Sequence, residues 1–200
     1  MFQITDAVKH LLFINIILFF ASLSLMADFK HQLYLFYPGS PMFQPWQVIT
    51  HMFMHGSTNH LLFNMLSLFF IGPLMEQSLG TKKFTIYYLA CGLGGAMLHI
   101  LSKFVLIHFM GSEAEIHIPV VGASGAINGL FIGLAYLYPN LPMSLLFIPI
   151  PVKAKYLAIF FLAGDLIWGL SGYHTGIAHY AHLGGAFMGF LLLYFWRARP

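Results

Sequence analysis

Six apolar segments divide the chain, and each is close to the length that a helix needs to cross a membrane. They cover residues 8–27, 57–75, 84–109, 119–138, 156–172 and 177–196, and about 20 helical residues span the hydrocarbon core. Only 8% of the 200 residues are charged, whereas 59% are hydrophobic. Soluble domains carry about 25% charged residues. The chain therefore cannot cover a surface that faces water, and the pattern predicts an all-α membrane protein with six transmembrane helices.

Turn-forming residues separate these segments. Proline, glycine and polar residues cluster at 38–41, 80–83, 111–113, 139–142 and 171–172, as expected of loops. The first apolar segment lacks a convincing cleavage site after it, so we interpret it as a retained helix and not a secretory signal. The sequence has neither internal repeats nor low-complexity tracts. We therefore predict a single transmembrane domain over residues 1–200.

Basic residues predict the orientation. If the N-terminus is cytoplasmic, seven basic residues face inward and only Lys30 and Lys103 face outward; the seven are Lys9, Lys82, Lys83, Lys153, Lys155, Arg197 and Arg199. The positive-inside rule then predicts cytoplasmic N- and C-termini. These residues are scattered over segment ends and form no patch, which argues against a nucleic-acid partner.

This orientation gathers several polar residues in the outer half of the membrane. His60 lies near the start of the second segment, Ser124 near the start of the fourth and His182 near the start of the sixth. Polar side chains are costly in lipid and usually mark function. A serine beside a histidine is a nucleophile and a base, so these residues are candidates for one shared catalytic site.

Small residues offer a way to bring the serine and the histidine together. Gly125, Gly129 and Gly133 recur every four residues after Ser124, and Ala181, Gly185 and Gly189 do the same around His182. Small residues at this spacing let two helices approach closely in lipid. A further four-residue series in the second segment consists of His60, Asn64, Leu68, Gly72, Glu76 and Gly80. Its upper members are candidate oxyanion donors, and Glu76 is a candidate polar tie between helices.

Four motifs in this order resemble the rhomboid intramembrane serine proteases. They are the H-x4-H-x3-N pattern of His55, His60 and Asn64; the Gly72-x3-Glu76-x3-Gly80 series; the Gly122-Ala123-Ser124-Gly125 motif; and Ala181-His182-x2-Gly185-x3-Gly189. The resemblance extends over essentially the whole chain and implies a six-helix rhomboid-like bundle. It also implies that no cofactor is needed.

The resemblance implies hydrolysis of peptide bonds within the membrane. Ser124 would attack a transmembrane helix of a protein substrate near its outer end, and His182 would act as the base. The Ser124 backbone N–H with the His60 and Asn64 side chains would hold the oxyanion. His55, Gly122 and Gly125 would support the site, and Gly185 and Gly189 would serve packing. Such a short chain resembles the minimal bacterial form, which implies the inner membrane with a site facing the periplasm or exterior.

Two positions depart from the family pattern. Trp46-Gln47 stands where the family usually has Trp-Arg, which predicts the loss of a hydrogen-bonding anchor in the first loop. Asn128 stands four residues after the serine, where an aromatic ring usually stacks on the catalytic imidazole. An asparagine cannot stack in this way, and we expect it to hydrogen-bond His182 and fix its tautomer.

Other interpretations stay open. A rhomboid-like pseudoprotease would bind transmembrane helices without cleaving them. A metal-dependent membrane hydrolase or transporter would use His51 with His55, or His179 with His182, as ligands, although the sequence lacks an H-E-x-x-H motif and offers few carboxylates. Asp165 would make a triad conceivable, but at seventeen residues before His182 we expect it to be solvated or at a helix end. Most other histidines, His179 among them, are expected to lie near span ends without a special role.

Overall fold

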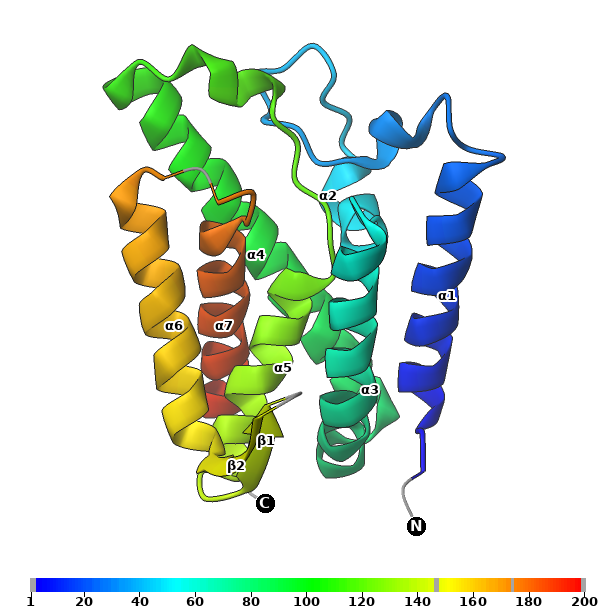
Figure 1. The fold of residues 1–200 in the computed structure, drawn as a ribbon, viewed down its shortest axis with the longest axis vertical. Coiled ribbons are helices and arrows are strands. Elements are labelled where there is room, and N and C mark those ends of the chain that lie inside the picture. The colour runs from blue at the N-terminus through cyan, green and yellow to red at the C-terminus, as the bar shows by residue number, and fades with distance from the viewer. Residues whose placement is uncertain (1–2, 146–147, 174, 199–200) are drawn as a thin grey trace.

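Six long helices stand side by side in one bundle in the computed structural model, which describes residues 3–145, 148–173 and 175–198. They are α1 (Asp6–Leu23), α3 (Thr58–Leu79), α4 (Thr81–Met110), α5 (Ser124–Leu137), α6 (Ala154–Ser171) and α7 (His179–Phe195) (Figure 1). Each helix overlaps one of the six predicted apolar segments. The helical part of the predicted fold is therefore confirmed.

The number of membrane crossings is a finer question than the number of helices. Within the described ranges, α1, α3, α4 and α6 are long and apolar enough to cross a membrane. The α5 helix has 14 residues and α7 has 17. A membrane-spanning helix usually has at least 17 residues, so α5 would cross only together with the extended chain before it. The count of six spans stays a prediction.

The connections contain short elements that apolar periodicity does not reveal. A 3₁₀ turn η1 (Lys30–Leu33), helix α2 (Gln47–Thr50) and 3₁₀ turn η2 (His51–Phe53) lie between α1 and α3, and η3 (Glu113–His117) follows α4. Strands β1 (Pro142–Leu145) and β2 (Ile148–Lys153) form an antiparallel hairpin with Pro142 opposite Lys153. The hairpin was not predicted, because its prolines indicate a loop.

The α5 helix begins deep in the bundle because the chain before it is extended. In Figure 1 this segment descends from η3 into the middle of the bundle before α5 starts. Val120 forms an antiparallel bridge with Leu35, and the Gly122 N–H donates to the His51 carbonyl at 2.9 Å. Extended backbone at this depth is tolerated where protein satisfies its polar groups. Ser124 is consequently the first residue of α5 and lies inside the bundle.

The α1 helix begins and the α7 helix ends at the same end of the bundle (Figure 1). Six of the seven basic residues predicted to face inward lie at this end of the bundle. They are found near the start of α1, at the α3–α4 junction, at the β2–α6 junction and after α7. The seventh, Arg199, lies outside the described residues, as does His174, which we expected near a span end. Which end faces the cytoplasm stays a prediction.

Close contacts between backbones hold α5 against α7. A methyl group at Gly185 would collide with the Gly125 carbonyl oxygen, and one at Gly189 would lie 3.0 Å from the Gly129 Cα. The predicted glycine series thus face each other over this part of the interface. Gly133 departs from the series, because it packs against Met75 and Tyr87 instead.

Gly185→Ala is expected to separate α5 from α7 and to move His182 away from Ser124. The added methyl meets a backbone carbonyl that cannot rotate away, and overpacking of this kind typically costs about 1–3 kcal/mol. Thermal unfolding in detergent measures the loss. Gly164→Ala on α6 is the matched control, since a methyl there meets nothing within 4 Å. Equal melting temperatures for the two variants would contradict this packing.

Glu76 joins the start of α1 to the α3–α4 junction. Its side chain is buried and accepts hydrogen bonds from Thr5 Oγ1 at 2.5 Å, from Thr81 Oγ1 at 2.7 Å, and from the Ala7 and Val8 N–H groups at 3.1 and 3.0 Å. The first N–H groups of a helix have no intrahelical acceptor, and Glu76 supplies one. The carboxylate therefore acts as a remote N-terminal cap for α1.

Gln47 anchors the first loop, contrary to our prediction that this anchor is lost. Its buried side chain donates to the Met42 carbonyl at 2.8 Å and the Gln32 carbonyl at 3.3 Å, and accepts from the Phe36 N–H at 3.3 Å. An amide can both donate and accept. Glutamine thus holds three backbone positions of the loop without a charge.

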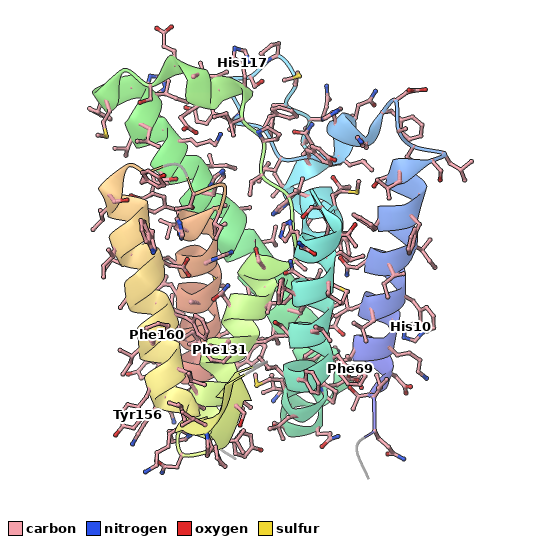
Figure 2. The ribbon with its side chains drawn as sticks, viewed as in Figure 1. His10, Phe69, His117, Phe131, Tyr156 and Phe160 are labelled. Carbon is pink, nitrogen blue, oxygen red and sulfur yellow. The ribbon has the colours of Figure 1, made fainter. Side chains whose placement is uncertain are left out.

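Large apolar side chains point outward from the bundle. Figure 2 shows Tyr156 and Phe160 projecting from the outer face of α6, and their exposed fractions are 55% and 68%. The outer face of α1 is similar, with Ile17 and Phe20 more than 60% exposed. A contiguous apolar exterior of this extent is unfavourable in water. It suits contact with lipid.

Candidate active site

Ser124 and His182 meet across the α5–α7 interface. The Ser124 Oγ lies 2.9 Å from His182 Nε2. This is within the reach required of a nucleophile and its base. The residues are 58 positions apart in sequence, and the glycine contacts between their helices allow the approach. The pairing expected from the four motifs is therefore present in the fold.

A third side chain completes the arrangement, in contrast to our expectation that Asp165 is solvated or at a helix end. Asp165 projects from α6, and its Oδ1 lies 3.1 Å from His182 Nδ1. An ionised carboxylate only accepts hydrogen bonds, so Nδ1 of His182 carries the proton. In the neutral ring Nε2 is then the acceptor and faces the Ser124 hydroxyl. The Asp165 side chain is 12% exposed.

The same carboxylate oxygen binds a second histidine. His179 Nδ1 lies 2.7 Å from Asp165 Oδ1, and His179 Nε2 lies 2.7 Å from Thr175 Oγ1. His179 is the first residue of α7 and so lies near a span end, as expected, but it also binds the carboxylate beside His182, which we did not expect. The useful sequence signal is the i, i+3 spacing of His179 and His182, which places both rings on one face of α7.

His60 and Ser124 approach the same small space next to Gly122. A methyl group at Gly122 would lie 2.7 Å from the His60 ring and 3.6 Å from Ser124 Oγ. The Gly122 φ angle is +126°, a conformation that strongly favours glycine. Glycine thus leaves open the space between a proposed oxyanion donor and the proposed nucleophile.

Asn64 lies one turn below His60 on α3. Its Nδ2 donates to the His60 carbonyl at 2.8 Å, and the amide carries a second N–H that this bond does not use. The His60 backbone N–H donates to Ser57 Oγ at 3.1 Å, and this N-terminal cap fixes the start of α3. The two predicted oxyanion side chains are therefore held by one helix end.

Asn128 does not make the hydrogen bond that we expected. Its Nδ2 donates to the carbonyl of Ser124, one turn earlier in α5, at 3.0 Å. The His182 ring instead takes its orientation from Asp165. The prediction that Asn128 fixes the tautomer is corrected, because a carboxylate on another helix already occupies Nδ1.

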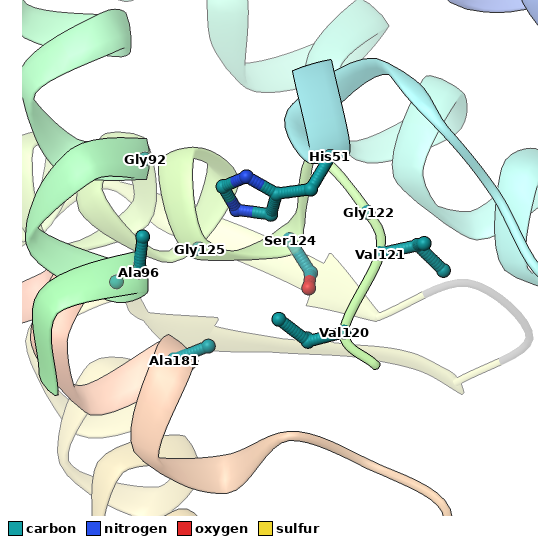
Figure 3. Close-up of a pocket in the computed structure, with 10 residues that line it drawn as sticks. His51, Gly92, Ala96, Val120, Val121, Gly122, Ser124, Gly125 and Ala181 are labelled. Atoms are coloured by element: carbon teal, nitrogen blue, oxygen red, sulfur yellow. The ribbon is translucent and has the colours of Figure 1, made fainter. Parts of the chain in front are cut away.

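A small cavity lies beside Ser124 (Figure 3). Its walls include His51, Val120, Gly122, Ser124 and Ala181. The cavity has a volume of about 10 Å³. That space is close to what one water molecule requires. In Figure 3 the His51 ring and the Ser124 hydroxyl border the same cavity. His51 was expected only as a possible metal ligand, so its place at the site was missed.

Two histidines between α2 and α3 are kept neutral by their surroundings. Burial lowers the pKa of His51 to about 4, although its Nδ1 lies 2.9 Å from the Gln47 carbonyl. Burial, with a smaller effect of the neighbouring His60 ring, lowers the pKa of His55 to about 3. The His55 and His60 rings meet edge to face with centroids 5.1 Å apart. Near neutral pH these histidines are therefore uncharged supports.

The residues around Asp165 form a cluster that could in principle hold a metal ion. One ligand atom each from Asp165, His179 and His182 lies within 4.8 Å of the others. Zinc holds its ligands at about 2.0–2.2 Å in a tetrahedron, which separates them by about 3.4 Å. The Oδ1–Nδ1 distance of 2.7 Å at His179 suits a hydrogen bond and is too short for two ligands of one ion. The present geometry fits hydrogen bonding better than metal coordination.

A family model and individual relatives identify the same protein family for this chain. The Rhomboid domain matches residues 42–199. The chain is similar to "RHOMBOID-like protein 4" of Arabidopsis thaliana, with 34% identity over 78% of this chain and 35% of that protein. It is also similar to "Rhomboid protease AarA" of Providencia stuartii, with 31% identity over 74% of this chain and 54% of that protein.

The chain thus matches between about a third and a half of the length of these relatives. The matched region includes α3 to α7 and therefore every residue of the candidate site described above. The α1 helix lies before it, so the single domain over residues 1–200 stays a prediction. From the domain match and the apolar helices it follows that the chain belongs to the rhomboid family and is a multi-pass integral membrane protein.

Proposed function

We propose that the protein is an intramembrane serine endopeptidase that cleaves transmembrane helices of other membrane proteins. The observation that carries this proposal is the 2.9 Å approach of Ser124 Oγ to His182 Nε2 inside an apolar bundle. Membership of a family that includes a protein named a rhomboid protease supports it. The substrate would be a transmembrane helix that reaches Ser124 inside the bundle and is cut near its own outer end.

The residues suggest a conventional acyl-transfer sequence. His182 Nε2 takes the Ser124 proton while Oγ attacks the scissile carbonyl, and the same proton then goes to the leaving amine. The tetrahedral oxyanion is held by the Ser124 backbone N–H, which lies in the first turn of α5 and has no intrahelical partner there, together with His60 and Asn64. Water then hydrolyses the acyl-enzyme by the same route in reverse.

Location and orientation form part of the proposal. Basic residues gather at the end where α1 begins and α7 ends, so the positive-inside rule places that end in the cytoplasm. Ser124 and His182 then lie in the outer half of the bilayer. We propose the cytoplasmic membrane of a bacterium, with the site open toward the periplasm or exterior.

The decisive test is cleavage of a model transmembrane substrate by the full chain in liposomes, combined with labelling by a fluorophosphonate probe. We expect cleavage and labelling in the wild type, neither in Ser124→Ala, and no effect of a metal chelator. Absence of both in a folded wild-type protein would favour a helix-binding pseudoprotease. Activity that survives Ser124→Ala but is lost with chelator would favour a metal-dependent hydrolase at the Asp165 cluster.

A further inference from the structure

Four hydrogen bonds form a continuous chain from the α6–α7 loop to the proposed nucleophile. They join Thr175 Oγ1 to His179 Nε2 at 2.7 Å, His179 Nδ1 to Asp165 Oδ1 at 2.7 Å, Asp165 Oδ1 to His182 Nδ1 at 3.1 Å, and His182 Nε2 to Ser124 Oγ at 2.9 Å. The three central side chains are at most 16% exposed. The chain of bonds is therefore largely shielded from solvent.

When the His179 and His182 rings are both neutral, only one arrangement of protons satisfies every donor and acceptor in this series of hydrogen bonds. The carboxylate of Asp165 accepts at both Nδ1 atoms, so each ring carries its proton there. Each Nε2 is then an acceptor that faces a hydroxyl group: Thr175 for His179 and Ser124 for His182. The Thr175 hydroxyl oxygen in turn accepts from the Ile177 N–H at 3.2 Å. Asp165 thus lies at the centre of two matching hydroxyl–imidazole pairs.

We infer that Asp165 is a positioning residue that makes the Ser124–His182 pair work as a triad, and that His179 with Thr175 holds the Asp165 carboxylate in place. This inference rests on the proposed protease function. Asp165 would fix the tautomer that leaves Nε2 free to accept the serine proton. When that proton arrives at Nε2, the Nδ1 proton stays on the ring, and the ionised carboxylate stabilises the imidazolium without taking a proton itself.

The arrangement also accounts for Asn128. This chain has no aromatic ring at position 128 to stack on the His182 imidazole, and the Asn128 side chain bonds within its own helix. The orientation of His182 is supplied from α6 instead. The His179 and His182 rings stand edge to face with centroids 6.4 Å apart. The His179 ring therefore also packs beside the His182 imidazole.

Asp165→Leu tests the inference, because leucine is of similar volume and has no acceptor. We expect kcat for a transmembrane substrate to fall about 10²-fold or more with KM little changed, since loss of the orienting acid in a serine protease costs up to about 10⁴. Asp28→Leu is the control, because Asp28 is an exposed acid outside the site. A loss of less than tenfold in Asp165→Leu would overturn the inference.

A second readout does not depend on activity. Imidazole ¹⁵N shifts of histidine-labelled protein report which nitrogen carries the proton, and His182→Gln identifies the His182 signals. We expect an Nδ1-protonated ring in the wild type and a loss of that preference in Asp165→Leu. Unchanged shifts would contradict the hydrogen bond. If the wild type cleaves no substrate, the proposed protease function fails, but these shifts still test the Asp165–His182 bond. If the wild type and Asp165→Leu are both fully active, the role of Asp165 fails and the proposed protease function stands.

His179→Leu separates the two parts of the inference. The Asp165–His182 bond remains possible in this variant, but the carboxylate loses its second donor. We expect a smaller fall in kcat than in Asp165→Leu and retention of the Nδ1-protonated form of His182. A loss as large as that of Asp165→Leu would show that His179 does more than hold the carboxylate, which would overturn the assigned order of roles.

Discussion

Replacing Ser124 by alanine is expected to lower kcat for a transmembrane substrate by about 10⁴-fold or more. The reason is that the hydroxyl oxygen is the atom proposed to form the acyl-enzyme, and no other hydroxyl is placed near His182 Nε2 by the hydrogen bonds of the described residues. Loss of a triad serine in soluble proteases has an effect of at least this size. Quantitative cleavage in liposomes under single-turnover conditions measures the change.

The Ser124→Ala, His182→Ala and double variants should be equally inactive. Residues that act as one unit are strongly non-additive, because removal of either disables the same step. Ser102→Ala is the matched control: its hydroxyl also lies in a helix but donates to the His99 carbonyl of its own helix at 2.7 Å. A double variant that is far weaker than either single variant would mean that the two residues act independently, which contradicts a shared mechanism.

Replacing His60 or Asn64 by alanine is expected to lower kcat by about 10²–10³-fold each. Both side chains lie at the start of α3 and are proposed to donate to the oxyanion, and loss of one such donor costs this much in other enzymes. Because the charge develops only in the transition state, KM should change little. The rate of fluorophosphonate labelling should fall in parallel, since the probe places an oxygen at the same position.

Asn59→Ala is the matched control for these two variants. Asn59 is adjacent to His60 on α3, but it is exposed. We expect its activity and melting temperature to match the wild type. If His60→Ala and Asn64→Ala raise KM and leave kcat unchanged, both residues bind the ground state of the substrate, and the oxyanion assignment fails.

The sequence by itself determines the main helices and the proposed dyad of this protein. Long apolar segments predict helices because backbone polar groups must be satisfied internally in lipid. The four motifs around His60, Glu76, Ser124 and His182 occur in the order of the rhomboid family, and glycines beside Ser124 and His182 indicate helices that approach closely. These features are local or repeat at helical spacing, so they can be found without coordinates.

Only the tertiary structure decides which side chains face the dyad from other elements. Asp165 is a single acid on α6, and no periodic pattern tells whether it points toward His182; the rotation of α6 against α7 decides this. The same holds for His51, which lines the cavity beside Ser124 from η2, and for Gln47, which binds carbonyls of distant loop residues.

The late start of α5 is only partly of this kind. Pro119 and Gly122 indicate in the sequence that the chain enters extended and turns helical at Ser124, and the bridge between Val120 and Leu35 and the positive φ of Gly122 show what holds it extended. Hydropathy reports only whether a residue can enter the bilayer. Whether its backbone is helical there depends on partners that the fold brings to it, and for Ser124 those partners set the depth of the proposed active site.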